Sequence, residues 1–202
     1  MRLLIVCTGN LCRSPMAAGL LSAWAQRDLG PEGSAVLVGS AGVEAPDGHP
    51  MDADSLRAAL AAGGDPETLG AHRSRALDPA EVADADLVLT MSRWQRKKVL
   101  AHAPRALRRT FTLPEAASLL GLADPRGIAD LPLDQRAAEL AVRLNAARAR
   151  RRVSDSDDVR DPIGRRFEEH RRTAERIAGD LHPLAAVLLG SGAVPAAAAT
   201  AS

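Results

Sequence analysis

The sequence has only two cysteines in 202 residues, Cys7 and Cys12, and both lie near the N-terminus. This scarcity excludes the disulfide framework that holds small secreted domains together. Long apolar runs are also missing, because none approaches the ~20 residues that span a bilayer and the apolar start at 3–6 is too short for a signal peptide. We therefore expect a cytoplasmic protein.

The chain also has few aromatic side chains and little net charge. The chain contains two Phe, two Trp and no Tyr, so its core has to be built from Leu, Val, Ile and Ala. The net charge of +1 gives no general attraction to nucleic acid or to an anionic membrane, and we expect neither as a partner. The length of 202 residues suits one domain with a sizeable core.

Apolar segments alternate with helical patterns through the first half of the chain. Continuous apolar runs are typical of strands buried on both faces of a sheet, and we expect strands at 3–7, 35–42, 86–91 and 108–113. Helices are predicted between them, with Ser14 as the N-cap of the first, at 14–27, 51–62 and 92–102. This alternation predicts an α/β fold: a doubly wound, four-stranded parallel sheet with helices on both faces, in a single domain.

Beyond residue 113 the alternation stops. Helical patterns at 114–121 and 133–152 are followed by a polar loop at 154–164 and by a long predicted helix at 165–189. The last residues, 190–202, are small and of low complexity, so they cannot bury a core and we expect them to be disordered.

Cys7 opens the loop that joins the first predicted strand to the first helix, Cys-Thr-Gly-Asn-Leu-Cys-Arg-Ser-Pro. Such a loop lies at the carboxyl edge of a parallel sheet, where its N–H groups and the helix N-terminus can bind an anion. Neither of the common glycine-rich phosphate motifs is present. The spacing instead places a thiol at the floor of the loop and Arg13, whose guanidinium can hold two phosphate oxygens at once, at its wall. The helix N-terminus and Arg13 both favour the reactive thiolate form of Cys7.

A lone cysteine at the end of a strand is most often a small buried apolar residue. Here the context C-x5-R-S-P favours function instead, and it resembles the loop of the low-molecular-weight protein-tyrosine phosphatase family, bacterial type. Further landmarks of that family follow in order, at 40–42, 71–77, 85–91 and 161–162. The resemblance covers about 1–115 and 155–189, so we expect a phosphatase-like domain at 1–189 with a helical insertion at about 116–153.

The resemblance implies a phosphatase that hydrolyses phosphotyrosine, an aryl phosphate monoester, on proteins through a phosphocysteine intermediate. In that mechanism Cys7 attacks phosphorus, and Arg13 and the loop amides bind the equatorial oxygens. Asp161 gives a proton to the departing oxygen and then activates water, with Asp157 and Asp158 as alternatives for the acid. No cofactor or metal is implied, and the five histidines are scattered.

The same resemblance implies roles for further residues. Those expected around the substrate are Thr8, Gly9, Asn10, Leu11, Cys12, Ser14 and Ile163. Asn10 is expected in a left-handed conformation, supported by Ser14, Ser40 and His72. The implied partner is a phosphotyrosine-containing protein, for example a bacterial tyrosine kinase, and the implied state is a monomer or weak dimer.

Two positions depart from the family pattern. Ser92 follows Met91 where many relatives carry Asp, and Ile163-Gly164 stands after the Asp-Pro pair where two aromatic residues are common. We therefore expect Leu11 and Ile163 to supply apolar walls for the substrate.

Three other functions stay open. Protein arginine phosphatases on this scaffold carry Thr at the position of Leu11, so the apolar side chain favours an aryl phosphate. Thioredoxin-coupled arsenate reductases need two further cysteines, which this chain lacks. A reductase that uses an external thiol needs none, although such loops more often carry Ser-Gln in place of Ser14-Pro15. A non-catalytic phosphate-binding module would not need both Cys7 and Asp161.

Cys12 has two interpretations. The curled loop is expected to bring it near Cys7, where it can capture a sulfenic acid on Cys7 as a disulfide and prevent irreversible oxidation. Alternatively, Cys12 packs as a small apolar residue.

Overall fold

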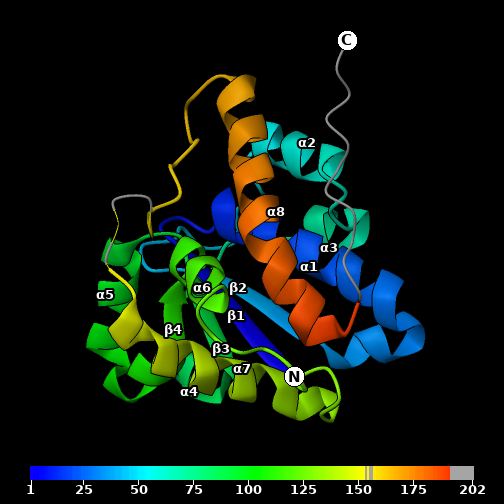
Figure 1. Cartoon of the computed structure of the whole chain (residues 1–202). Coiled ribbons are helices and arrows are strands. Elements are labelled where there is room, and N and C mark those ends of the chain that lie inside the picture. Colours follow the sequence, from blue (N-terminus) through cyan, green and yellow to red (C-terminus); the bar gives the residue numbers. More distant parts are fainter. Residues whose placement is uncertain (153, 155–156, 192–202) are drawn as a thin grey trace.

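A four-stranded parallel sheet forms the centre of the protein. The computed structural model describes residues 1–152, 154 and 157–191. The strands lie in the order β2-β1-β3-β4, as Figure 1 shows. Val6 pairs with both Ala41 and Thr90, so the carboxyl ends of three strands meet at one edge. The predicted α/β class is confirmed, with strands β1 (Arg2–Cys7), β2 (Leu37–Gly42), β3 (Leu87–Thr90) and β4 (Thr110–Thr112).

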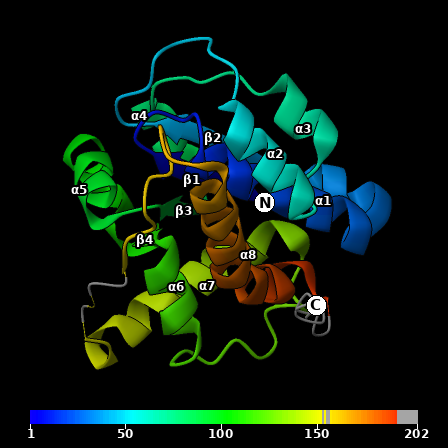
Figure 2. The ribbon, with the colours of Figure 1, turned by 90° about the horizontal axis from the view of Figure 1, so that it is seen from above.

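Helices cover both faces of the sheet (Figures 1 and 2). One face carries α1 (Arg13–Leu29), α2 (Ala53–Ala61), α6 (Leu113–Leu120), α7 (Leu133–Ala147) and α8 (Phe167–Leu189), with α3 (Pro66–Ala71) beside α1. The other face carries α4 (Pro79–Asp84) and α5 (Arg93–His102). Short 3₁₀ helices connect them, η1 (Gly30–Ala35), η2 (Pro104–Arg109) and η3 (Arg148–Arg150). No described helix has the length and apolar character needed to cross a membrane.

The apolar run of β1 contributes to two cores. Leu3 and Ile5 face the larger cluster under α1 and α8, whereas Leu4 and Val6 face a smaller one that includes Val99 of α5. Because side chains alternate along a strand, a strand with helices on both faces needs an apolar residue at every position. This is why continuous apolar runs predicted the sheet.

The predicted helical insertion at about 116–153 packs into the same core. Ala137, Leu140 and Leu144 of α7 are buried in the larger cluster, and α7 contacts β1, β3 and α8. Figure 1 shows α7 near the N-terminus, at the end of the sheet where β1 begins. Its helix α7 therefore belongs to the single domain and lies at the end of the sheet opposite the loop after β1. Residue 153 and residues 192–202, most of the stretch predicted to be disordered, lie outside the described residues.

The first helix begins differently from the prediction. α1 starts at Arg13 with Cys12 as its N-cap, and no side chain caps it. Ser14, the predicted N-cap, is fully buried in the first turn, and its hydroxyl contacts Cys7 and Asn10. The prediction was wrong because the preceding loop, rather than the helix end, uses this hydroxyl.

Candidate active site

The loop after β1 surrounds the Cys7 sulfur. Cys7 is the last residue of β1, and only 2% of it is exposed. Its Sγ accepts a hydrogen bond from the backbone N–H of Asn10 at 3.2 Å and lies 3.0 Å from Ser14 Oγ. The strand end and these two contacts hold the thiol at the floor of the loop.

Asn10 fixes the curvature of the loop. Its φ of +54° is left-handed, which confirms the predicted conformation. The side-chain Nδ2 donates to Ser14 Oγ at 2.9 Å and to Ser40 Oγ at 3.0 Å, and Oδ1 accepts from the Arg75 N–H at 3.0 Å. Burial lowers the pKa of His72, so its ring is neutral at pH 7 and Nε2–H donates to the Asn10 carbonyl at 2.7 Å. The structure thus brings Ser14, Ser40 and His72 together around Asn10.

The end of β2 lies directly against the loop. A Cβ added to Gly42 would lie 2.4 Å from the Thr8 carbonyl oxygen and 3.0 Å from the Asn10 nitrogen, so only glycine leaves room for this approach. Next to it, the Glu44 N–H donates to the same Thr8 oxygen at 3.0 Å. The Ser-Ala-Gly segment therefore has two physical tasks, since Ser40 binds Asn10 and Gly42 makes space for the backbone.

Arg13 forms a buried wall of the loop. Its Nη1 donates to the Val159 carbonyl at 3.1 Å, its Nη2 donates to Thr8 Oγ1 at 3.4 Å, and Nη2 also forms an ion pair with Asp161. Its Nε is buried and has no hydrogen-bond partner among the described residues. An unsatisfied buried donor costs about 1–3 kcal/mol, so this guanidinium is suited to an anionic ligand that supplies the missing acceptor.

Asp161 lies at the mouth of the loop. Its carboxylate pairs with Arg13, while its side chain stays 41% exposed. The Ile163 N–H donates to Asp161 Oδ1 at 3.3 Å, a short-range turn contact that orients the carboxylate. A carboxylate that touches the buried arginine and still reaches solvent can exchange protons with a bound substrate and with water.

The two alternative acids are engaged elsewhere. Asp157 is buried, and both its oxygens receive hydrogen bonds from Arg151. Burial acts to raise the pKa of Asp157, but the hydrogen bonds and positive charge of Arg151 outweigh it and the pKa is lowered. Asp158 accepts a hydrogen bond from the Arg93 N–H at 2.7 Å, at the start of α5. Of the three candidates, the structure brings Asp161 alone into contact with Arg13.

Gln95 is a site residue that the sequence analysis missed. It is buried in α5, its Nε2 donates to Thr8 Oγ1 at 3.0 Å, and its Oε1 accepts from the Met91 N–H at 2.9 Å. The Thr8 hydroxyl therefore accepts from both Gln95 and Arg13, which links α5 to the loop arginine. Ser92, the residue that departs from the family pattern, is the N-cap of α5 and accepts from the Gln95 N–H.

Cys12 lies on the helix side of the loop. It is buried, and burial, opposed by a hydrogen bond with Ser55, raises the pKa of its thiol to about 12. Ser55 Oγ in turn lies 2.8 Å from His170 Nδ1, so a buried polar chain connects the loop through α2 to α8. Both cysteines are free thiols, and Cys12 is protonated at neutral pH.

Leu11 and Ile163 are the predicted apolar walls. Leu11 is half-buried, its backbone oxygen accepts from the Asp52 N–H at 3.0 Å, and its side chain lies beside Gly9. Ile163 is 47% exposed within residues 161–164, the segment that carries Asp161 and that we call the acid loop. Both side chains are thus partly open to solvent, as a wall of a substrate site has to be.

A nucleophilic thiol and a buried guanidinium that share one loop are suited to attack on a bound phosphoryl group, and this arrangement on a parallel sheet defines a class, the cysteine-dependent phosphatases. Within this class, the model of the family described as low molecular weight phosphotyrosine protein phosphatase matches residues 2–140. The chain belongs to this family. Asp161 lies beyond the matched residues, so its assignment to the site depends on its contact with Arg13.

Relatives with two different substrates are similar to the chain. The probable low molecular weight protein-tyrosine-phosphatase EpsP of Ralstonia nicotianae is 35% identical over 123 residues, 61% of this chain and 77% of its own length. The protein-arginine-phosphatase of Geobacillus stearothermophilus is 36% identical over 128 residues, 62% of this chain and 79% of its own length. Among solved structures, a YwlE arginine phosphatase variant with a phosphorylated active-site serine has a TM-score of 0.67 at 26% identity, covering 95% of this chain and 97% of that one.

Proposed function

We propose that the protein hydrolyses phosphotyrosine on other proteins through a phosphocysteine intermediate at Cys7. The observation that carries the proposal is the meeting of three groups at the loop after β1, two of them on the loop itself and the third brought to it from the distant segment around Asp161. Cys7 lies at the floor of the loop, Arg13 at its wall with Nε unpartnered among the described residues, and Asp161 in contact with Arg13 at its mouth.

In the first step, the Cys7 thiolate attacks phosphorus opposite the aryl oxygen. The N–H groups of residues 8–13 and the Arg13 guanidinium bind the equatorial oxygens, so fixed donors meet the charge of the transition state. A phosphate in the loop competes for the Arg13 N–H groups that Asp161 holds in this structure. Once released from Arg13, the solvent-exposed carboxylate takes up a proton from water and, as the neutral acid, gives it to the departing aryl oxygen.

In the second step, water attacks the phosphocysteine. Asp161 acts as the base that removes a proton from this water, and the phosphoryl group leaves as inorganic phosphate while Cys7 returns to its starting form. In the YwlE arginine phosphatase variant, the active-site serine carries the phosphoryl group. That finding on a related protein supports a covalent intermediate at the corresponding place in this chain.

Hydrolysis of phosphoarginine is a second candidate, because the YwlE structure and the Geobacillus stearothermophilus relative are both arginine phosphatases. Leu11 is the feature that favours the aryl substrate. Its side chain is half-buried and apolar, so it packs against an aromatic ring but offers no hydrogen bond to a guanidino group.

The proposal includes the cellular setting. A free thiol nucleophile requires a compartment that keeps thiols reduced, which supports the cytoplasm. The partner is then a phosphotyrosine-containing protein, and a bacterial tyrosine kinase is one such substrate. We propose a monomer or weak dimer as the working state.

The test compares two peptides that differ only in carrying phosphotyrosine or phosphoarginine, with arsenate plus thiols as a third substrate. We expect the highest kcat/KM on phosphotyrosine. The matched variant Leu11→Thr should shift the ratio toward phosphoarginine, because it adds a hydroxyl at the wall. A wild-type preference for phosphoarginine or arsenate would overturn the proposal.

A further inference from the structure

Positive charge gathers around the acid loop without matching negative charge. Arg160, Arg165 and Arg166 are exposed, and within the described parts of the chain their side chains make no hydrogen bond or ion pair. Two exposed arginines in the first turns of α8 behave differently. Arg171 pairs with Glu168, and Arg172 pairs with Glu169, both on α8.

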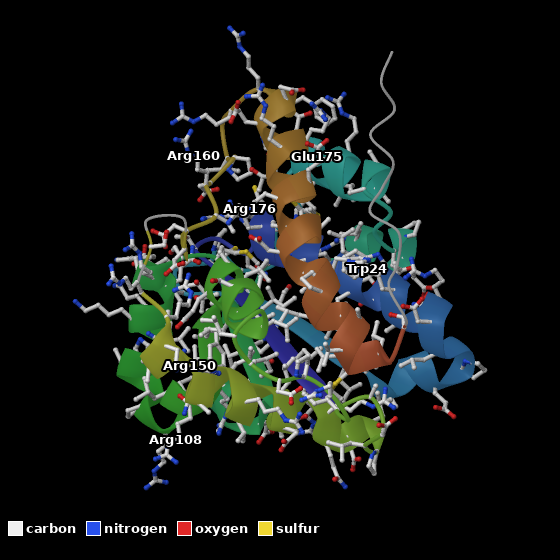
Figure 3. The ribbon with its side chains drawn as sticks, in the orientation of Figure 1. Trp24, Arg108, Arg150, Arg160, Glu175 and Arg176 are labelled. Atoms are coloured by element: carbon white, nitrogen blue, oxygen red, sulfur yellow. The ribbon has the colours of Figure 1, made fainter. Side chains whose placement is uncertain are left out.

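The three arginines bracket the proposed acid. Arg160 directly precedes Asp161, and Figure 3 shows it pointing outward from the segment that leads into α8. A turn follows, in which the Arg165 N–H donates to the Pro162 carbonyl at 2.9 Å and Gly164 has a φ of +69°. Arg160 therefore lies directly before the turn and Arg165 and Arg166 directly after it, and all three side chains are exposed.

The acidic groups near this cluster already have partners. Asp161 is paired with Arg13, and Asp158 accepts from the Arg93 N–H. Glu44, whose backbone N–H contacts the loop at Thr8, pairs through its side chain with Lys98. The charge of the three arginines is therefore available to a molecule that approaches the mouth of the loop.

We propose that this arginine cluster, Arg160, Arg165 and Arg166, binds acidic residues that flank the phosphotyrosine of the substrate. The inference rests on the proposed function, since it adds the sequence context that the same site selects. An extended peptide advances ~3.3–3.6 Å per residue, so carboxylates within a few positions of the phosphotyrosine extend past the mouth of the loop toward the segment that carries these arginines. Nucleic acid is a poorer match. A protein that binds DNA through its backbone can contact roughly 6–10 phosphates, whereas this cluster has few arginines and the chain has a net charge of only +1.

The test uses phosphotyrosine peptides of equal length with Glu, Gln or Lys at the flanking positions. In wild type at low salt, we expect kcat/KM for the Glu peptide to exceed that for the Gln peptide by about fivefold, and the preference to fall as salt rises. The double variant Arg160→Gln/Arg165→Gln should bring the ratio near unity. Taking the ratio of two peptides cancels any effect on attraction of the phosphate itself.

The matched control is Arg105→Gln/Arg108→Gln. These arginines are also exposed, make no hydrogen bond or ion pair in the described chain, and lie on η2; Figure 3 shows Arg108 at the end of the molecule away from Arg160. The control has the same net charge as Arg160→Gln/Arg165→Gln. It should keep the wild-type ratio of kcat/KM for the Glu peptide to that for the Gln peptide. An unchanged ratio in the double variant, or an equal loss in the control, would overturn the inference.

Two further outcomes are distinguishable. If no phosphotyrosine peptide is hydrolysed, whatever its flanks, the proposed function itself has failed. If the Glu and Gln peptides are hydrolysed equally but the cluster binds vesicles of anionic lipid or a DNA duplex in sedimentation or gel-shift assays, the surface serves a different partner and the inference is wrong.

Discussion

Replacing Asn10 tests whether a single buried amide shapes the phosphate-binding loop. Asn10→Ala removes hydrogen bonds to Ser14 and Ser40 and leaves the Arg75 N–H without its acceptor. The stranded donor costs about 1–3 kcal/mol and each lost bond about 0.5–1.5 kcal/mol. Alanine at a φ of +54° adds about 1–2 kcal/mol of backbone strain. We therefore expect the free energy of unfolding to fall by about 3–8 kcal/mol, a large share of the roughly 5–15 kcal/mol of an ordinary domain.

The matched variant Asn10→Gly separates the two causes. Glycine loses the same hydrogen bonds but adopts a positive φ without strain, so it should be about 1 kcal/mol more stable than the alanine variant. Urea unfolding followed by circular dichroism measures both. Turnover of a small aryl phosphate should fall in both variants, because the backbone N–H that Asn10 donates to Cys7 Sγ is displaced. Wild-type stability and activity in Asn10→Ala would refute the reasoning, and equal stability of the two variants would refute the strain contribution.

Three other predictions follow from individual contacts. Asp161→Ala should slow hydrolysis of phosphotyrosine by about 10²- to 10⁴-fold, and much less for aryl phosphates with good leaving groups; equal losses would argue against an acid. After peroxide treatment and dithiol, wild type should recover activity and Cys12→Ser should not. The attacking group is the Cys12 thiolate and the pKa of Cys12 is about 12, so the rate of disulfide formation should rise about tenfold for each unit by which the pH is raised. Equal recovery of wild type and Cys12→Ser would show that Cys12 only packs as an apolar residue. Arg151→Ala should lower the free energy of unfolding by about 3–5 kcal/mol at pH 7, because it strands buried Asp157. The pKa of Asp157 is lower in the folded than in the unfolded state, so its contribution is present at neutral pH and lost as pH falls below about 4, and acidification should destabilise the variant less than wild type in urea unfolding.

The strands of the sheet were predictable because each buried strand is marked by the apolar residues of its own segment. β1 and β3 are buried on both faces and therefore appear as uninterrupted apolar runs. The short helices α3 and α4 were missed, although each carries a local signal. Both begin with Asp-Pro, and the Asp65 and Asp78 side chains accept hydrogen bonds from the first-turn N–H groups. Six residues are too few for an apolar stripe to show, so only the capping signal was available.

The candidate active site also has one part that the sequence predicts and another that it does not. Cys7 and Arg13 lie on one contiguous loop, so a motif is enough to pair them. The contact between Arg13 and Asp161 joins residues 148 positions apart in the sequence. Neither this contact nor the hydrogen bond from Arg13 to the Val159 carbonyl can be predicted from sequence spacing. Gln95 was missed for that reason, because a glutamine three residues after a serine predicts a helix cap and gives no sign of the Thr8 hydroxyl across the sheet edge.

The most direct test of the account is to trap the phosphoryl group on the enzyme. Wild type and Cys7→Ser are mixed with a phosphotyrosine peptide, quenched in acid during turnover and digested for mass spectrometry. Wild type should carry a phosphoryl group on the peptide that contains Cys7, at the sulfur, and Cys7→Ser should not turn over although it stays folded and retains some phosphate binding. Steady release of phosphate by Cys7→Ser at the wild-type rate, or turnover in wild type with no label on that peptide, would contradict the account.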